Sequence, residues 1–353
     1  MTAHVIGPIR GVRIAGMGTA FPARALDNLA ALRAVPQALG GRELSEERLA
    51  FIADNIQETM GVRERAWAHV PGTPLDPASE ETSLDLATRA AREAIDDASV
   101  PASDVRVVLA STSTPPRMSS TISAPLASSL ALRAACMDMR TGCSGGLFAL
   151  ATAALHVSAG CEAALVVGAE TFSKVIPPVS KVAVVSLGDG AGALVLRRDP
   201  SGSGALLSAA METDGALGGL ITTDGALPPT AEEMTRGGYL LSGAPEELSQ
   251  IVPGKYEAAI RAALDRAGVA ASDVDLYVPH QTSAPLVAKV AATFGIPSDK
   301  AFVNVDRHAN VGAAGWLVAL AEARAEGRVG PGATVLLAAV GGGMSWAAAV
   351  VRW

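Results

Sequence analysis

The chain has 353 residues, of which 49% are hydrophobic and 18% charged, and its formal net charge is −7. A chain of this size and apolar content can bury a large core, which excludes wholesale disorder. The negative charge argues against a nucleic-acid partner, because such a partner requires a basic surface.

The cysteines and the N-terminal residues indicate in which cellular compartment the protein is expected to lie. The three cysteines, at positions 136, 143 and 161, form no CxxC pair and no disulfide framework, as expected in a reducing cytosol. The N-terminal stretch lacks the charged start and apolar run of a signal peptide. No apolar stretch reaches the roughly 18 residues of a membrane-spanning helix. We therefore expect a cytoplasmic protein that does not bind a membrane.

The predicted elements fall into two halves joined by a segment rich in glycine and proline. Residues 1–199 predict a first half of alternating helices and strands, interrupted by an insertion at about 25–80. Residues 200–255 predict a lid or insertion. Residues 256–353 predict a second half with the same kinds of element. The alternation of strands and helices indicates the α/β class.

Three segments of the first half recur in the second half in a nearly constant register, so that Val105 falls on Val274 and Leu147 on Leu317. The pairs are 87–114 with 258–283, 143–151 with 313–321, and 163–169 with 333–339. Each half therefore has the order helix, strand, loop, helix, strand, which predicts a mostly parallel sheet covered by helices. We expect two such halves to pack around a pseudo-twofold axis.

Equivalent loops of the two halves carry different polar residues. Cys143 falls on Ala313 in the second half, and Asn310 lies shortly before that alanine. His280 follows the strand that corresponds to the one ending at Ser111. Pseudo-symmetry is expected to bring these loops to one face at the strand ends, where α/β folds build their sites.

Cys143 stands between small residues, in the stretch TGCSGG, at the predicted start of a helix. Unpaired N–H groups and the helix dipole at such a start favour the thiolate, which is the reactive form of cysteine. The alternative is a buried core cysteine, the interpretation that applies to Cys136 and Cys161. In the same way, His280 is open to interpretation as a structural histidine, and Asn310 as a turn residue or helix cap. His308, two residues before Asn310, is the histidine that we expect to have no catalytic role.

Six motifs stand in a fixed order along nearly the whole chain. They read MGVRER (60–65), GCSGGLFAL (142–150), LGDGAGALVL (187–196), PHQTS (279–283), HANVGAAG (308–315) and GGGMSWAAAVVRW (341–353). In this order they resemble the motifs of ketoacyl-acyl-carrier-protein synthase III and its relatives in the thiolase superfamily. The resemblance implies a thiolase-like duplicated αβαβα five-layer fold with pseudo-twofold symmetry and a homodimer. It also implies that Cys143, His280 and Asn310 form a catalytic triad.

The same resemblance implies the chemistry. Cys143 takes an acyl group from a thioester, with the backbone N–H groups of Cys143 and Gly342 as the oxyanion hole. His280 and Asn310 donate hydrogen bonds to the thioester oxygen of a second substrate, whose enolate attacks the acyl-Cys and forms a C–C bond. The substrates are acyl thioesters carried by an acyl carrier protein or by coenzyme A, and no bound cofactor or metal is expected.

Three positions depart from the pattern of the primary-metabolism enzymes. Asn55 and Thr59 align with the Trp and Arg that hold the adenine of coenzyme A in those enzymes. Pro285 aligns with an arginine linked to carrier-protein and pantetheine-phosphate contacts. These departures favour acyl groups delivered by a carrier protein, in polyketide or fatty-acid-type biosynthesis.

A further departure concerns the residues expected to bind substrate, Arg117 and Met118. Counted back from the nucleophile, Arg117 stands where relatives that fuse two acyl chains carry a glutamate that acts as a base. Met118 is expected near the acyl pocket or the dimer contact, where a flexible thioether suits varied chains. Three alternatives stay open: non-decarboxylative fusion of two acyl or β-ketoacyl chains, as in α-pyrone or olefin pathways; acyl transfer to a hydroxyl or amine; and a non-catalytic paralogue.

Overall fold

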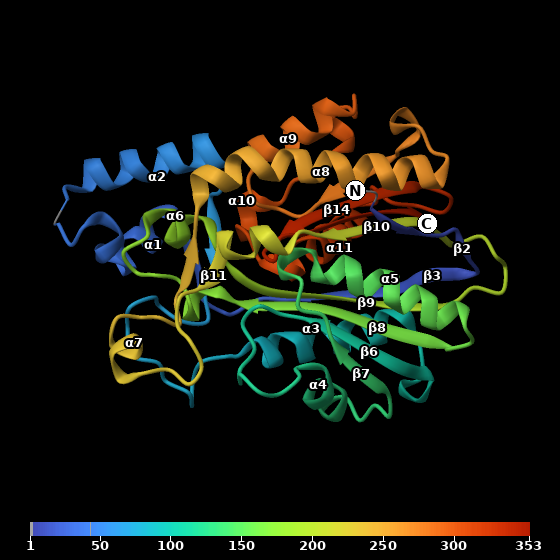
Figure 1. Cartoon of the computed structure of the whole chain (residues 1–353), viewed down its shortest axis with the longest axis horizontal. Helices are drawn as coiled ribbons and strands as arrows, with labels where there is room; N and C mark the ends of the chain where they lie inside the picture. The colour runs from blue at the N-terminus through green and yellow to red at the C-terminus, as the bar shows by residue number, and fades with distance from the viewer. Residues whose placement is uncertain (1–2, 43) are drawn as a thin grey trace.

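The structure is a computed structural model that describes residues 3–42 and 44–353. It contains two main β-sheets and three layers of helices, and Figure 1 shows the layers stacked from the top of the view to the bottom. Helices α8 (Pro245–Ala267) and α9 (Ala284–Thr293) cover one sheet, and α3 (Ser83–Ala98) and α4 (Ser123–Ser129) cover the other. Helices α5 (Gly145–Ser158) and α11 (Gly315–Ala325) lie between the sheets. The predicted αβαβα five-layer arrangement is confirmed.

The two sheets have the same internal plan. The first sheet has the order β3 (Val12–Ala20), β9 (Asp189–Arg198), β8 (Ala163–Thr171), β6 (Val105–Ser111) and β7 (Ala135–Asp138). The second has the order β1 (His4–Ile6), β10 (Ala205–Thr213), β15 (Ser345–Arg352), β14 (Thr334–Gly341) and β13 (Leu276–Pro279), with β2 (Ile9–Arg10) also on β10. Each sheet has one strand with a parallel neighbour on one side and an antiparallel neighbour on the other: β8 lies between β6 and β9, and β14 lies between β13 and β15. The duplication predicted from the sequence is therefore present in the strand pairing.

The helices differ in composition according to their layer. α3 has a capping box between Thr82 and Asp85 and buries one face, as an outer helix should. α5 and α11 are apolar on most sides, because each packs on both sheets and forms the core between them. Their buried members include Leu147, Leu150 and Leu317.

Two segments lie outside the layers. The first contains β4 (Ala25–Asp27), α1 (Asn28–Ala34), α2 (Glu46–Met60) and β5 (Glu64–Ala66). The second, residues 214–244, contains β11 (Ile221–Thr223), α7 (Ala231–Thr235) and β12 (Leu241–Gly243). The segment 200–255 also contains β10 and the first part of α8, so only its middle lies outside the layers. The division at residues 199 and 255 stays a prediction.

The remaining short helices support loops at the strand ends. They are α6 (Lys181–Ser186) and α10 (Val305–His308). Among residues 3–42 and 44–353, none of the helices has both the length and the apolar content needed to cross a lipid bilayer.

Candidate active site

Cys143 lies in the 3-10 turn Gly142–Ser144, which leads directly into α5. Gly142 adopts φ +55°, and a Cβ at this position would come within 2.5 Å of the Gly342 nitrogen, so the turn requires glycine. Cys143 is only partly exposed. Burial, followed by the Glu170 carboxylate, raises the pKa of its thiol to about 12. The expectation of a resting thiolate is therefore not met, because desolvation outweighs the N–H groups at the helix start.

His280 follows β13 and is held by its backbone, whose N–H donates to the Ala338 carbonyl at 2.7 Å. Only 1% of the residue is exposed. Burial lowers the pKa of its imidazole to about 4, so the ring is neutral at physiological pH. Within the described part of the chain, neither ring nitrogen has a hydrogen-bond partner. A neutral ring with unpaired nitrogens can offer one N–H to a substrate oxygen.

Asn310 lies between α10 and the turn Gly312–Ala314, which leads into α11. Its backbone is held on both sides, because its N–H donates to the Ser186 carbonyl and its carbonyl accepts from the Gly188 N–H. Its side-chain oxygen accepts from the Gly312 N–H at 2.8 Å. Within residues 3–42 and 44–353, the nitrogen of the Asn310 side chain has no hydrogen-bond partner. This NH2 group is therefore available as a donor.

The loops that carry these three residues meet where α5 and α11 begin. The Gly142–Ser144 turn packs directly against the Gly312–Ala314 turn. A Cβ on Gly315 would lie 2.7 Å from the His280 ring, so the start of α11 contacts the imidazole. Tyr256 of α8 donates its hydroxyl to the His280 carbonyl at 3.4 Å. Burial, followed by the nearby Cys143, raises the pKa of this phenol. The structure thus brings the three predicted loops together.

Glu170, at the end of β8, is a buried carboxylate beside this site that the motifs did not indicate. It accepts hydrogen bonds from the Ser113 N–H at 3.0 Å, the Thr114 hydroxyl at 2.8 Å and the Ala313 N–H at 3.5 Å. Burial raises the pKa of this carboxyl to about 7. The signal in the sequence is a lone acidic residue in the apolar run AALVVGAETF.

The backbone around Gly342 lies against the nucleophile turn. A Cβ on Gly341 would come within 2.3 Å of the Cys143 nitrogen. Gly342 itself has room, because the nearest atom to an added Cβ would be 3.5 Å away. The N–H groups of Cys143 and Gly342 are therefore on adjoining stretches of backbone, and their role as an oxyanion hole stays a prediction.

Arg117 and Met118 are not brought into this cluster by the single chain. Both lie on an exposed loop between β6 and α4, and 71% of Met118 is accessible to solvent.

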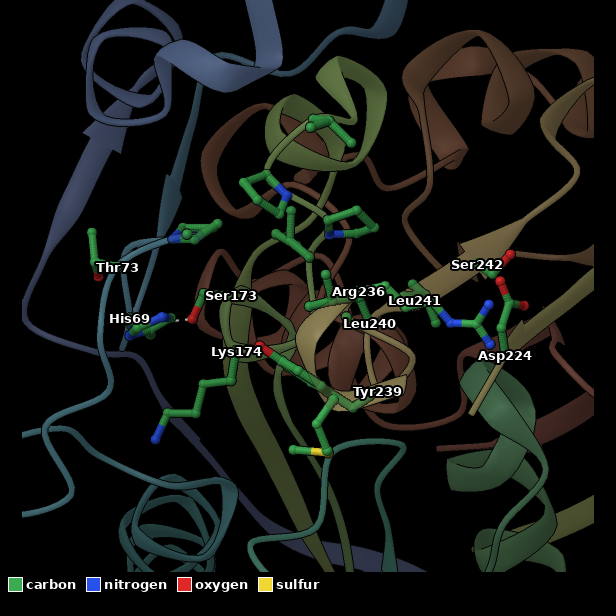
Figure 2. A pocket seen from close by; sticks show the side chains of 18 of the residues that line it. His69, Thr73, Ser173, Lys174, Asp224, Arg236, Tyr239, Leu240, Leu241 and Ser242 are labelled. Atoms are coloured by element: carbon green, nitrogen blue, oxygen red, sulfur yellow. Dashed lines mark hydrogen bonds between the residues drawn. The ribbon is translucent and has the colours of Figure 1, made fainter. Parts of the chain in front are cut away.

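A separate cavity of about 540 Å³ lies beside the two segments outside the layers. Its lining comes from residues 69–73, 173–179 and 234–242, together with Asp224, and Figure 2 shows these side chains around the opening. The Nδ1 atom of His69 forms a hydrogen bond with the Glu80 carboxylate at 2.9 Å. The volume is in the range of small-molecule sites, and Cys143 is not part of the lining.

Comparisons with known proteins show which family of proteins the chain is similar to. The family model for 3-oxoacyl-[acyl-carrier-protein] synthase III matches residues 137–215, and the model for its C-terminal part matches residues 264–353. The β-ketoacyl-[acyl-carrier-protein] synthase III of Brucella anthropi is 34% identical over 98% of this chain and 100% of its own length. The crystal structure of 3-oxoacyl-[acyl-carrier-protein] synthase III from Aquifex aeolicus matches with a TM-score of 0.82 and 28% identity, over 97% of this chain and 100% of that one.

A third match shows the fold alone. OleA from Xanthomonas campestris shares a TM-score of 0.80 over 98% of this chain and 100% of its own, at 20% identity.

The duplicated five-layer fold, with a cysteine at the start of its central helix, defines a condensing enzyme of the thiolase class. The chain belongs to the 3-oxoacyl-[acyl-carrier-protein] synthase III family. It is accordingly a cysteine-dependent ketosynthase, in the acyltransferase class of enzymes.

Proposed function

We propose that Cys143, His280 and Asn310 carry out a two-step condensation of acyl thioesters, one delivered by an acyl carrier protein. One observation supports this proposal: two hydrogen-bond donors lie beside the Cys143 turn. Within the described part of the chain, the neutral His280 ring has no hydrogen-bond partner, and the Asn310 amide nitrogen is free. An enolate needs hydrogen-bond donors at its oxygen, and these two side chains supply them.

In the first step the Cys143 sulfur attacks the carbonyl carbon of an acyl thioester. The carbonyl π electrons move to oxygen, where the N–H groups of Cys143 and Gly342 stabilise the charge; each donor is worth about 3 kcal/mol. Collapse of the intermediate breaks the bond to the carrier sulfur, and the thiol proton ends on that leaving sulfur. Because both the thiol and the imidazole are neutral at rest, transfer of this proton accompanies attack rather than preceding it.

In the second step a malonyl-type thioester binds with its thioester oxygen against His280 and Asn310. Its C–CO2 bond breaks, CO2 leaves, and the electron pair forms an enolate whose oxygen the two donors hold. The enolate carbon attacks the acyl carbon on Cys143, forming a C–C bond and breaking the C–S bond. The Cys143 sulfur leaves as a thiolate and takes a proton from the solvent, which restores the resting thiol.

A carrier protein, rather than coenzyme A, is the proposed source of the first acyl group. Asn55 and Thr59 are exposed on α2, and the Thr59 hydroxyl donates back to the Asn55 carbonyl at 2.6 Å. Neither short side chain offers an aromatic face or guanidinium to an adenine. Pro285, in the first turn of α9, offers no charge to a phosphate. The pathway we propose is of the polyketide or fatty-acid type.

We propose that the working protein is a homodimer in which Arg117 and Met118 serve the partner's substrate cavity. The support is the exposure of Met118, a large apolar side chain, in a loop that does not reach the site of its own chain. Asp224 and residues from 234–242 line part of the cavity of Figure 2, and we propose that the segment 200–255, which contains them, bounds the space for the acyl chain. We further propose that turnover needs no bound cofactor or metal and takes place in the cytoplasm.

Intact-mass analysis tests the first step. The protein is incubated with matched acyl-carrier-protein and acyl-coenzyme A donors, and the acyl mass is mapped to Cys143. Cys143→Ala is expected to take up no acyl group. Acylation by coenzyme A donors alone would contradict the proposed carrier.

Product analysis tests the second step, with malonyl, β-ketoacyl and alcohol acceptors. Release of CO2 with a C–C bonded product supports the proposal. A C–C bonded product without CO2 identifies chain fusion instead, an ester identifies acyl transfer, and no product with any acceptor identifies a non-catalytic protein. Asn310→Ala is expected to keep acylation and lose condensation. Undiminished turnover by this variant would show that the role proposed for Asn310 is wrong.

A further inference from the structure

A cluster of charged and polar side chains lies behind the Asn310 loop and has no part in the chemistry described above. At its centre is Glu322 of α11. Its carboxylate accepts hydrogen bonds from the His308 ring at 2.6 Å and from the Asn304 amide at 2.8 Å, and it forms an ion pair with Arg307 at 2.9 Å. All three partners lie in or next to α10, so Glu322 joins that short helix to α11.

The cluster also reaches the histidine motif. The Asn304 N–H donates to the Gln281 side-chain oxygen at 3.1 Å. The Gln281 amide in turn donates to the carbonyls of Pro279 and Phe302, at 2.9 and 3.0 Å. Gln281 directly follows His280 and is 1% exposed. One chain of hydrogen bonds therefore runs from the residue beside the imidazole to Glu322.

The other end of the cluster is His308, two residues before Asn310. The His308 ring stacks on Phe21, with centroids 4.3 Å apart and the planes 8° from parallel. The next residue, Ala309, has φ +55°, which an alanine rarely adopts. Such backbone persists only where the surrounding contacts over-determine it. The ring of His308, one residue earlier, contacts Glu322 and Phe21.

We propose that Glu322 is a positioning residue for condensation, which holds α10 and the strained Ala309 so that the Asn310 amide faces the substrate oxygen. This inference rests on the role proposed above for Asn310. Glu322 acts as a carboxylate: burial alone would raise its pKa, but the hydrogen bonds of His308 and Asn304 and the charges of His308 and Arg307 lower it overall. Three side chains on or next to α10 thus share one acidic partner.

The test compares Glu322→Gln with the natural protein in separate half-reactions. The amide keeps the shape but loses the charge and half of the accepting capacity. Acylation of Cys143, followed by mass, is expected to stay within about twofold, because the polar contacts of Glu322 in the described chain go to the α10 region and not to the Cys143 turn. The single-turnover rate of condensation, normalised to acylated Cys143, is expected to fall about 10- to 100-fold, since small displacements of a catalytic group have effects of that size.

Glu326→Gln is the matched control. Glu326 lies one turn further along the chain, and its ion pair in the described structure is with Arg307, at 3.5 Å. Condensation by this variant is expected to match the natural protein. Glu322→Asp keeps the charge but shortens the side chain. Its condensation rate is expected to lie between the rates of the natural protein and Glu322→Gln. It replaces Glu322→Gln in the test if that variant does not fold.

A double variant separates positioning from general destabilisation. The double variant combines Glu322→Gln with His308→Gln. If Glu322 acts through His308, its condensation rate is only slightly lower than that of the slower single variant. If the two residues act independently, the two losses multiply. Equal losses in both half-reactions, multiplying effects, or undiminished condensation in a folded Glu322 variant would overturn the proposal. Asn310→Ala is measured beside them: if it condenses normally, the proposed function fails first, and if it alone fails to condense, only the role of Glu322 is wrong.

Discussion

Gly142 and Gly312 stand at equivalent positions of the two halves and adopt the same left-handed backbone, with φ of +55° and +56°. Each begins a 3-10 turn that leads into a central helix, α5 or α11. The next residue is Cys143 in one half and Ala313 in the other. Two equivalent turns thus present a thiol from one half and, through Asn310 just before Gly312, an amide from the other. The asymmetric site arises from a symmetric backbone.

The first prediction concerns the contact between the Gly341 backbone and the nucleophile turn. Gly341→Ala is expected to lower acylation of Cys143 by a large factor or to prevent folding, because its Cβ would lie 2.3 Å from the Cys143 nitrogen. Gly342→Ala, one residue later, has space for the added methyl group and keeps its N–H, so acylation is expected to stay within a few-fold. The measurement is the acylation rate by intact mass, with circular dichroism as the check on folding. Equal rates in the two variants would contradict this packing.

The second prediction concerns the protonation of Cys143. Its thiol pKa of about 12 means that the thiolate fraction rises about tenfold per pH unit from about pH 7 to about pH 10. The rate of alkylation by iodoacetamide, followed by peptide mapping, is expected to rise in the same proportion without levelling off. Cys136 is quantified in the same digest as an internal reference. A plateau for Cys143 near pH 8 would show a thiolate already formed at rest.

The third prediction concerns His280 and stability in acid. The pKa of the folded imidazole is about 4 against an ordinary value of 6.5, so between these values the unfolded chain binds the proton and folding becomes less favourable. The cost grows as the pH falls through this window and is on the order of 3 kcal/mol at its end. His280→Gln removes the titrating group. Urea unfolding at about pH 7.5 and pH 5 is therefore expected to show a smaller loss of unfolding free energy in the variant than in the natural protein.

The fourth prediction concerns Glu170, whose effect on stability has the opposite sign. The folded pKa of about 7 exceeds the ordinary 4.5, so the contribution of this carboxyl is present below about pH 4.5 and is lost as the pH rises through 7. Glu170→Gln should remove that dependence. It should also lower the pKa of the Cys143 thiol, since the carboxylate is the second cause of its elevation, and speed alkylation at about pH 8.

A control for this variant is Glu162→Gln, which alters a half-buried carboxylate paired with Arg197 and Arg198. In this control, the pH dependence of the unfolding free energy and the rate of Cys143 alkylation are both expected to match the natural protein. Slower alkylation in Glu170→Gln would contradict the electrostatic link between the two side chains.

Much of the fold could be predicted because hydrophobic periodicity and the repetition of one half in the other can be found along the chain itself. The matched segments became β6 and β13, α5 and α11, and β8 and β14, in the expected order. The pattern could not show that β10, inside the segment expected to form a lid, pairs with β15 in the second sheet. Strand pairing of this kind depends on contacts between residues far apart in the sequence, which no local pattern records.

The sequence by itself determined which residue types stand at the loop positions of a duplicated α/β chain, and so named Cys143, His280 and Asn310. Only the tertiary structure decided the state of those groups. Burial raises the pKa of the Cys143 thiol, for which a thiolate was expected, and lowers the pKa of the His280 imidazole. It also brought Glu170 against the turn that contains Ala313, and Glu322 against His308. Desolvation and hydrogen bonding depend on what surrounds a side chain in space, and those surroundings exist only after the two halves have packed together.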